Sequence, residues 1–250
     1  MSEPSAPALR DVDLLAIEND VVCPFDERGR RVGNYGLGIA VARDGYLVVL
    51  GSDVPDALAT ELEAAVADTP PAFDPTTAPR VLDGCRRLLE QSGGPVQQSG
   101  PNPSYLIPPD TRFSSGAEII RSDDGNADEL VRSLRGANPQ PGGWTATEWD
   151  DLLDGTLGPW AMAMVDGRVV SICHTPRHLT ERGAECGVWT HPDFRGRRHA
   201  PAVTAAWASV LAPTGRHLFY STEADNRSSQ RVAARLGLRV IGWSWTLARD

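Results

Sequence analysis

Hydrophobic residues in the second half of the chain recur in short runs typical of strands. Strands are predicted at AEIIRSDD (117–124), AECGVWT (184–190), HLFYST (217–222) and RVIGWSWTL (239–247). The run WAMAMVDGRVVSICHT (160–175) predicts a β-hairpin that turns at Asp166-Gly167. Helical spacing is found at 127–135, at 147–153 after the capping residue Thr145, after Pro192, and in the segment that ends at Gly237.

The first half contains more breaks, and its pattern predicts a smaller α/β module. Two strand segments around Asp44-Gly45 are expected within 36–53, followed by helices at 55–67 and within 77–93. Proline, glycine, serine and glutamine then dominate up to residue 109, where we expect a connection with one short strand near 105–107. We place the domain boundary near residue 112, so that the modules are 1–112 and 113–250.

Composition narrows the class of protein. The chain has 250 residues and a formal net charge of −9, which argues against a general nucleic-acid binder. No apolar stretch approaches the roughly 20 residues that a membrane span needs, and the start of the chain lacks the apolar core of a signal peptide. Its four cysteines show no CxxC spacing. We therefore expect a cytoplasmic protein with reduced thiols and no nucleic-acid or membrane partner, either a monomer or a homodimer.

Three arginines and a glycine gather just before an apolar helical run. Arg195, Gly196, Arg197 and Arg198 lie between the strand 184–190 and this run. A strand that turns directly into a helix leaves the first N–H groups of the helix unpaired, and the helix dipole adds positive charge there. Such a loop can bind phosphate, and glycine lets the backbone approach the ligand closely. The cluster alone also fits a solvated surface turn.

The surrounding residues strengthen the phosphate interpretation. The stretch VWTHPDFRGRRHA (188–200) resembles the acetyl-coenzyme A signature of GCN5-related N-acetyltransferases, the GNAT family, in which a (Q/R)-x-x-G-x-(G/A) loop joins a strand to a helix. Arg195 and Ala200 match the outer positions, whereas Arg198 stands where the family usually has glycine. NRSSQRVAARLGL (226–238) resembles a second family segment, in which Asn226 and Gly237 match. The resemblance covers about residues 115–250.

The resemblance implies a fold and an activity. The fold is α/β, a mixed and mostly antiparallel sheet flanked by helices, with a V-shaped opening between the strands 184–190 and 217–222. A degenerate copy of the same fold is one interpretation of the N-terminal module. The implied activity is acetyl transfer from acetyl-CoA, the acyl-donor substrate, to an amine of a small-molecule acceptor. A non-catalytic acyl-CoA sensor and a transferase that uses a longer acyl donor are the alternatives.

The donor site follows from the same resemblance. Backbone groups of the strand are expected to pair with the pantetheine arm, amides of the loop to bind the pyrophosphate, and the amide of Val188 to stabilise the oxyanion. The reaction is expected to be direct transfer without an acyl-enzyme. The expected donor-binding residues are Val188, Trp189, Thr190, Arg195, Gly196, Arg197, Arg198, His199, Ala200, Asn226 and Ser229.

Proton transfer is harder to assign. Glu185, three residues before Val188, is the first candidate for the base, although a carboxylate in water or paired with arginine fits the pattern as well. Glu223 and Asp225 are second candidates. The position at which the family usually has its tyrosine general acid is Ala233. Tyr220 is the candidate replacement, although it could instead be a core residue, and water or a loss of the chemistry are further alternatives.

Histidines and tryptophans offer weaker signals. His174 and His178 are four residues apart, but Pro176 between them argues against a shared helical face, so we expect no metal site. An acceptor-facing role for His174 stays open. Trp144, Trp149 and Trp160 fall where the family walls its acceptor pocket, and we expect at least two of them to be core residues.

Overall fold

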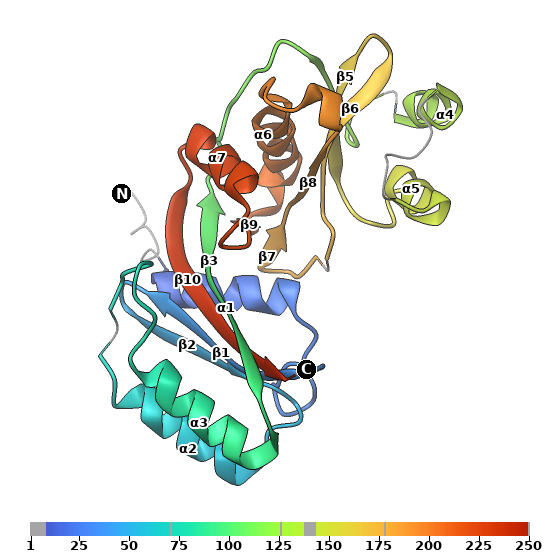
Figure 1. Ribbon diagram of the computed structural model, residues 1–250. Helices are drawn as coiled ribbons and strands as arrows, with labels where there is room; N and C mark the ends of the chain where they lie inside the picture. The colour runs from blue at the N-terminus through green and yellow to red at the C-terminus, as the bar shows by residue number, and fades with distance from the viewer. Residues whose placement is uncertain (1–8, 71, 126, 138–143, 178, 250) are drawn as a thin grey trace, which may run out of the picture. The chain divides into compact units, whose positions relative to one another are not determined.

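The computed structural model describes residues 9–70, 72–125, 127–137, 144–177 and 179–249. The chain forms two compact units (Figure 1). The first unit contains Met1–Ser104, Thr222–Asp225 and Val240–Asp250, and the second contains Tyr105–Ser221 and Asn226–Arg239. We expected a single domain boundary, near residue 112. The difference arises because the C-terminal strand pairs with strands of the first unit, a long-range contact that local patterns do not report.

The first unit is a sheet covered by three helices. Its strands follow the order β2-β1-β10-β3, and β1 pairs antiparallel with both β2 and β10. Helix α1 packs on β1 and β2, and α2 and α3 pack on each other and on the same hairpin (Figure 1). The elements are α1 (Asp11–Val22), β1 (Tyr35–Ala42), β2 (Gly45–Leu50), α2 (Asp56–Ala67), α3 (Val81–Gly93), most of β3 (Val96–Ile107) and nearly all of β10 (Arg239–Arg249).

Two elements of this unit differ from the predictions. Helix α1 was not predicted, because acidic residues interrupt its apolar pattern and the side chain that caps its first turn belongs to the distant Asp44, which accepts from the Asp11 and Val12 N–H groups. Strand β3 extends over twelve residues instead of the few expected near 105–107. Its prolines and glycine are usually strand breakers. Pairing with neighbouring strands overrides this local preference.

The second unit contains a four-stranded antiparallel sheet with the order β4-β5-β6-β8. The end of β3 is followed by β9 and then β7 in the strand order of the other sheet. The elements are β4 (Glu118–Arg121), α4 (Ala127–Ala137), α5 (Ala146–Leu153), β5 (Trp160–Val165), β6 (Arg168–His174), β7 (Gly183–Glu185), β8 (Gly187–Thr190), η1 (Pro192–Phe194), α6 (His199–Leu211), η2 (Ala212–Thr214), β9 (His217–Ser221) and α7 (Arg227–Leu236).

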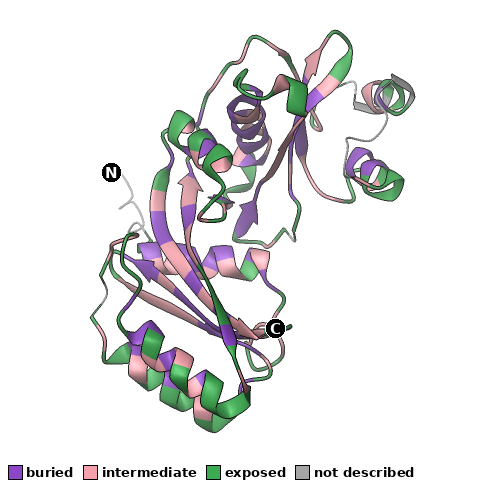
Figure 2. Cartoon of the chain, in the orientation of Figure 1, coloured by how far each residue is buried: buried purple, intermediate pink, exposed green. Residues whose placement is uncertain are grey.

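Helices cover both faces of the four-stranded sheet. Helix α6 lies against β4, β5, β6 and β8, and Figure 2 shows that it is buried along most of its length. The other face forms a second core with α4 and α5, in which Trp149 is 4% and Trp160 is 1% exposed. The expectation that at least two of the three tryptophans are core residues is confirmed.

Several local predictions are confirmed. The β5–β6 hairpin turns at Asp166 and Gly167, both with positive φ, as the Asp-Gly pair requires. Helix α7 ends at Gly237, which adopts the left-handed conformation. The predicted strand 184–190 is present but divided at Cys186 into β7 and β8. The expected mixed, mostly antiparallel sheet flanked by helices is therefore the observed fold.

Thr145 caps α5, and this cap provides a test of the fold. The Glu148 N–H donates to Thr145 Oγ1 at 3.1 Å, and the Thr145 N–H donates to Glu148 Oε2 at 2.7 Å. We expect Thr145→Ala to destabilise α5 by about 1 kcal/mol, because a first-turn N–H loses its acceptor. Amide hydrogen exchange within Ala146–Leu153 should accelerate. Thr145→Ser keeps the hydroxyl and should exchange like the wild type, and equal exchange in all three proteins would contradict the capping role.

Candidate active site

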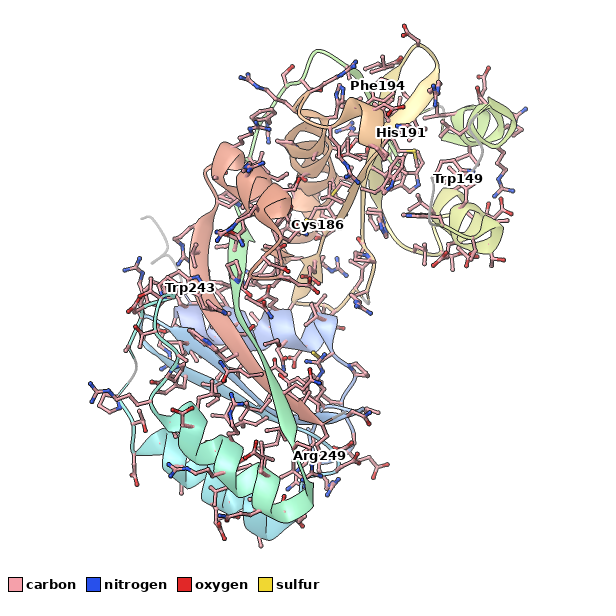
Figure 3. The ribbon with its side chains drawn as sticks, viewed as in Figure 1. Trp149, Cys186, His191, Phe194, Trp243 and Arg249 are labelled. Atoms are coloured by element: carbon pink, nitrogen blue, oxygen red, sulfur yellow. The ribbon has the colours of Figure 1, made fainter. Side chains whose placement is uncertain are left out.

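The site begins where one strand changes its partner. Strand β7 runs parallel to β9, with Glu185 opposite Phe219, and the Cys186 N–H still donates to the Phe219 carbonyl at 3.1 Å. From Gly187 onward the chain pairs with β6 instead. A Cβ on Gly187 would lie 2.9 Å from Pro176 Cγ, which explains the glycine. Figure 3 labels Cys186 at this break. The expected V-shaped opening therefore forms between β8 and β9.

The pairing of β8 decides which backbone groups face the opening. The His191 N–H donates to the Val170 carbonyl at 2.9 Å, one position beyond the pair Ser171–Thr190. Hydrogen-bonded and non-hydrogen-bonded pairs alternate along an antiparallel ladder. Val188 and Thr190 therefore direct their N–H and C=O groups away from β6, whereas Trp189 directs its groups toward β6. Val188 thus offers its N–H and C=O groups to the opening, and Thr190 offers its N–H, while the Thr190 carbonyl accepts a hydrogen bond from Arg195 Nε at 3.4 Å.

A cavity of about 450 Å³ lies at this opening, within the second unit. It is bordered by β8, by the loop and first turn of α6, by β9 and by α7. Its lining residues are Val188, Trp189, Thr190, Phe194, Arg195, Gly196, Arg198, His199, Ala200, Pro201, Tyr220, Asn226, Ser228, Ser229, Arg231, Val232 and Arg235. Of the expected donor-binding residues, all but Arg197 line this one cavity.

The loop before α6 has the backbone that an anion site needs. Gly196 has a φ of 80° and Arg198 a φ of 69°, so both adopt the left-handed conformation. Arg198 is the N-cap of α6 and makes no side-chain capping bond, which leaves the first N–H groups of the helix without that acceptor. The left-handed backbone explains why the related signature usually has glycine at the position of Arg198.

Four arginines surround the cavity: Arg195, Arg198, Arg231 and Arg235. None of them makes a salt bridge to another residue that the structure describes. Arg231 and Arg235 were not predicted as site residues, although their spacing of four residues places them on one face of α7. Arg197 instead stacks over the Phe194 ring at 4.9 Å (Figure 3 labels Phe194). The cavity is therefore strongly cationic.

His199, the first residue of α6, also lines the cavity and is buried. Its side chain is 5% exposed, and Nδ1 lies 3.2 Å from Ser115 Oγ. Burial, together with the nearby charge of Arg197, lowers the pKa of the imidazole below its ordinary value. The other ring nitrogen, Nε2, is buried and has no hydrogen-bond partner in the structure. A neutral histidine therefore begins α6.

Tyr220 and Ser229 meet at the side of the cavity. The Tyr220 hydroxyl lies 2.6 Å from Ser229 Oγ and 3.3 Å from the Ser229 carbonyl. Tyr220 is 3% exposed, and burial raises the pKa of its hydroxyl well above the ordinary value. Ala233, at the position of the family's tyrosine, is fully buried in the core. Tyr220 is therefore a core residue whose hydroxyl reaches the cavity, and its role as the replacement acid stays a prediction.

Glu185 lies at the end of β7, outside the residues that line the cavity. Its side chain is 8% exposed, and the Ser221 hydroxyl donates a hydrogen bond to its Oε1. Burial raises the pKa of this carboxyl, while the Ser221 bond and the charge of Arg177 act in the opposite direction. A carboxyl with a raised pKa can take a proton from an amine near neutral pH. Its role as the base stays a prediction.

Other predicted residues have different surroundings. Burial lowers the pKa of His174 to about 4, and its ring meets the edge of Trp144 at 5.0 Å between centroids. Its buried Nδ1 has no hydrogen-bond partner in the structure. Glu223 and Asp225 belong to the first unit, so the structure assigns them no geometry in this site. His178 lies outside the described residues.

Among the described residues, no three histidine, cysteine, aspartate or glutamate side chains gather as a candidate metal site. No helix within the described part of the chain has the length and apolar character to cross a membrane.

Comparison with known families agrees with this geometry. The acetyltransferase (GNAT) domain matches residues 116–239, which include β8, the loop, α6, β9 and α7. This domain of the chain belongs to the GNAT acetyltransferase family, whose members transfer acyl groups from acetyl-CoA. The resemblance inferred from the two sequence segments is confirmed.

Two solved structures illustrate the wider similarity. A GNAT-family acetyltransferase from Colwellia psychrerythraea is 15% identical over 98% of this chain and 98% of that chain, with a TM-score of 0.48. A GCN5-related N-acetyltransferase-like protein from Streptococcus suis is 17% identical over 95% of this chain and 92% of that chain, with a TM-score of 0.44. A comparison with curated protein sequences found no match.

The two left-handed residues of the loop predict opposite effects on stability. Arg198→Gly should stabilise the protein by about 1 kcal/mol, because glycine adopts positive φ without the Cβ clash. Gly196→Ala should destabilise it by a similar amount for the converse reason, although nothing lies within 4 Å of the added Cβ. Chemical denaturation measures both changes, with Arg198→Ala as the control that removes the side chain and keeps the Cβ. Changes of the same sign in Arg198→Gly and Gly196→Ala would contradict the loop geometry.

Proposed function

We propose that the second unit transfers an acetyl group from acetyl-CoA to the amine of a small molecule. The observation that carries this proposal is the cavity in which outward-facing backbone groups of β8 meet the arginine-lined N-terminus of α6. Such a combination suits a ligand with an extended amide-containing arm and a polyanionic end. Acetyl-CoA has both.

The proposed donor site has two parts, the exposed edge of β8 and the loop that begins α6. The N–H and C=O groups of Val188 and the N–H group of Thr190 would pair with the pantetheine arm in the manner of an added strand. The pyrophosphate would bind at the amides of the loop and first turn, from Arg195 to Ala200, where the helix dipole favours an anion. Arg195 and Arg198 would add charge-assisted hydrogen bonds, and Asn226 and Ser229 would border the donor from α7.

The chemistry then requires two groups on the strand that divides at Cys186. The amine attacks the thioester carbonyl, and its nitrogen forms the new bond to carbon. The amide of Val188 would donate to the oxyanion that develops on the carbonyl oxygen. Glu185 would accept the proton that the amine loses, and the C–S bond then breaks to release coenzyme A. No covalent acyl-enzyme is involved.

The proposed acceptor is small because Glu185 is nearly buried. With 8% of the residue exposed, the Glu185 carboxyl would admit only a compact amine on a narrow substituent. An alkylamine has a pKa of about 10 and is mostly protonated at neutral pH, so a nearby carboxylate both attracts the ammonium and removes its proton.

Donor binding is expected to stabilise the fold. At acetyl-CoA concentrations of about 100 times the dissociation constant, binding to the folded state raises the free energy of unfolding by roughly 2.7 kcal/mol. A thermal scan with millimolar acetyl-CoA should therefore show a clear increase in Tm, and an acceptor screen should release free thiol. Stabilisation without thiol release from any amine would favour the sensor alternative, and the same scan with longer acyl-CoA donors tests the donor alternative. An unchanged Tm would contradict donor binding altogether.

Glu185→Gln tests the base. Because burial raises the pKa of Glu185, the carboxylate form appears only above its ordinary range, and kcat/KM of the wild type should rise with pH through that pKa. The substitution keeps the shape and should lower kcat/KM by about two to four orders of magnitude at pH 7, with a smaller loss at high pH where the amine is neutral. Glu181→Gln, in the exposed loop before β7, is the matched control. A wild-type rate in Glu185→Gln at pH 7 would exclude this base.

A further inference from the structure

We propose that His199 takes up a proton when the acyl donor binds, so that its charged imidazolium ring donates a hydrogen bond to a phosphate oxygen and the affinity for the donor increases as the pH falls. This inference rests on the proposed function. It goes beyond that function because it makes donor binding depend on pH through the side chain of a buried histidine. His199 would contact the phosphate end of the donor and not the reacting thioester.

One ring nitrogen of His199 has a partner and the other has none. Nδ1 lies 3.2 Å from Ser115 Oγ, whereas Nε2 is buried and has no hydrogen-bond partner among the described residues. The residue is 5% exposed and lines the cavity, and its ring meets that of Phe194, another lining residue, at 6.4 Å between centroids. A buried polar atom without a partner is unfavourable. At the wall of a cavity, such a nitrogen indicates a hydrogen bond that forms when a ligand binds.

The groups around His199 disfavour a charged imidazole in the free protein. Burial, together with the charge of Arg197, lowers the pKa of the ring. The N-terminus of α6 adds the positive end of the helix dipole. Four further arginines line the cavity, and the described lining residues include no aspartate or glutamate. His199 is therefore neutral at pH 7 when no anion occupies the cavity.

The carboxylates closest in sequence to these contacts are exposed to water. Asp193, in η1, has a side chain that is 83% exposed, and its carboxylate lies 3.8 Å from His191 Nδ1. Glu118, at the start of β4 and three residues after Ser115, is also exposed. Neither carboxylate lines the cavity. Water screens both charges, so neither replaces an anion inside the cavity.

The sheet beneath α6 offers little charge to the ring. Strands β5 and β8 have no titratable side chains. On β6, Arg168 is exposed, Cys173 is packed in the core under α6, and His174 meets Trp144 on the other face of the sheet. On β4, Arg121 is paired with two aspartates. The bound donor is therefore the negative charge to which His199 can respond.

The donor carries the charge that reverses this balance. Its pyrophosphate is negatively charged throughout the range near neutral pH, and an opposite charge within about 4–6 Å favours the charged form of a histidine. Protonation makes both ring nitrogens hydrogen-bond donors. Nδ1–H would then donate to Ser115 Oγ and Nε2–H to a phosphate oxygen, and the added proton comes from the solvent.

The direction of the pH dependence follows from linkage. In the free protein His199 loses its proton below the ordinary pKa of about 6.5, and in the complex it loses the proton at a higher pH. Between these two pKa values, binding takes up one proton, and the dissociation constant of the donor increases by up to about tenfold per pH unit. Donor affinity is therefore highest at low pH and is lost as the pH rises through the pKa of the complex.

Calorimetry in buffers of different ionisation enthalpy counts the protons that binding takes up. The first probe is acetylated coenzyme A without its 3′-phosphate, because that phosphate titrates near pH 6 and would add its own protons. Between about pH 5.5 and 8, the wild type should take up a maximum of about 0.3 to 1 proton per donor bound. His199→Gln can still donate a hydrogen bond but cannot become charged, and it should take up less than about 0.1 proton.

Two further variants locate the proton. His191→Gln is the matched control, because His191 also meets the Phe194 ring, at 5.7 Å, but does not line the cavity. It should take up as many protons as the wild type. Ser115→Ala removes the acceptor of Nδ1–H in the charged ring, so its proton uptake should be smaller than that of the wild type and should shift to lower pH.

Nitrogen NMR of the imidazole rings follows the same proton in the wild type without relying on a variant's stability. The His199 ring should be neutral in the free protein at pH 7 and should titrate at a higher pH once the donor is bound. Acetyl-CoA itself is the second probe, because subtracting the proton uptake of His199→Gln removes the contribution of its 3′-phosphate.

Equal proton uptake in the wild type and His199→Gln would overturn the inference. An unchanged His199 titration in the complex, or a loss of proton uptake in His191→Gln, would overturn it as well. In each of these cases the donor still binds, so the proposed function stands. If the wild type binds neither form of the donor, it is instead the proposed function that fails.

Discussion

The change of partner between β7 and β8 is the constraint on which the site depends. Up to Cys186 the strand pairs with β9, and from Gly187 it pairs with β6. Gly187 permits this crossing because any Cβ there would contact Pro176 and His174. The divergence leaves one edge of β8 without a neighbouring strand, and unpaired backbone groups at such an edge are ready to bind an extended ligand.

The other parts of the site follow from this opening. Helix α6 is anchored by its buried apolar residues against the four-stranded sheet, so its N-terminus is held beside the end of β8. Arg198 and Gly196 shape the loop between them, and α7 closes the cavity with two further arginines. Glu185 lies on β7, just before the divergence, and Val188 just after it. The same break in pairing thus determines the positions of both the proposed base and the proposed oxyanion donor.

Local sequence patterns correctly predicted the features that depend only on neighbouring residues. The Asp166-Gly167 hairpin, the Thr145 cap and the end of α7 at Gly237 each follow from residues within a few positions. Long-range contacts were not accessible in the same way. Strand β3 and the assignment of β10 to the first unit depend on pairing between distant segments, and the Tyr220–Ser229 contact joins a strand to a helix. That unit 1 is a degenerate copy of the same fold stays a prediction.

Residue-resolved amide hydrogen exchange, without and with saturating acetyl-CoA, tests the central claim most directly. The free edge of β8 predicts that the amides of Val188 and Thr190 exchange rapidly in the free protein and slow markedly when acetyl-CoA binds. The amides of Gly187 and Trp189, which face β6, should be protected in both states. Protection of Val188 and Thr190 in the free protein, or exchange at these two amides that acetyl-CoA leaves unchanged, would contradict the account.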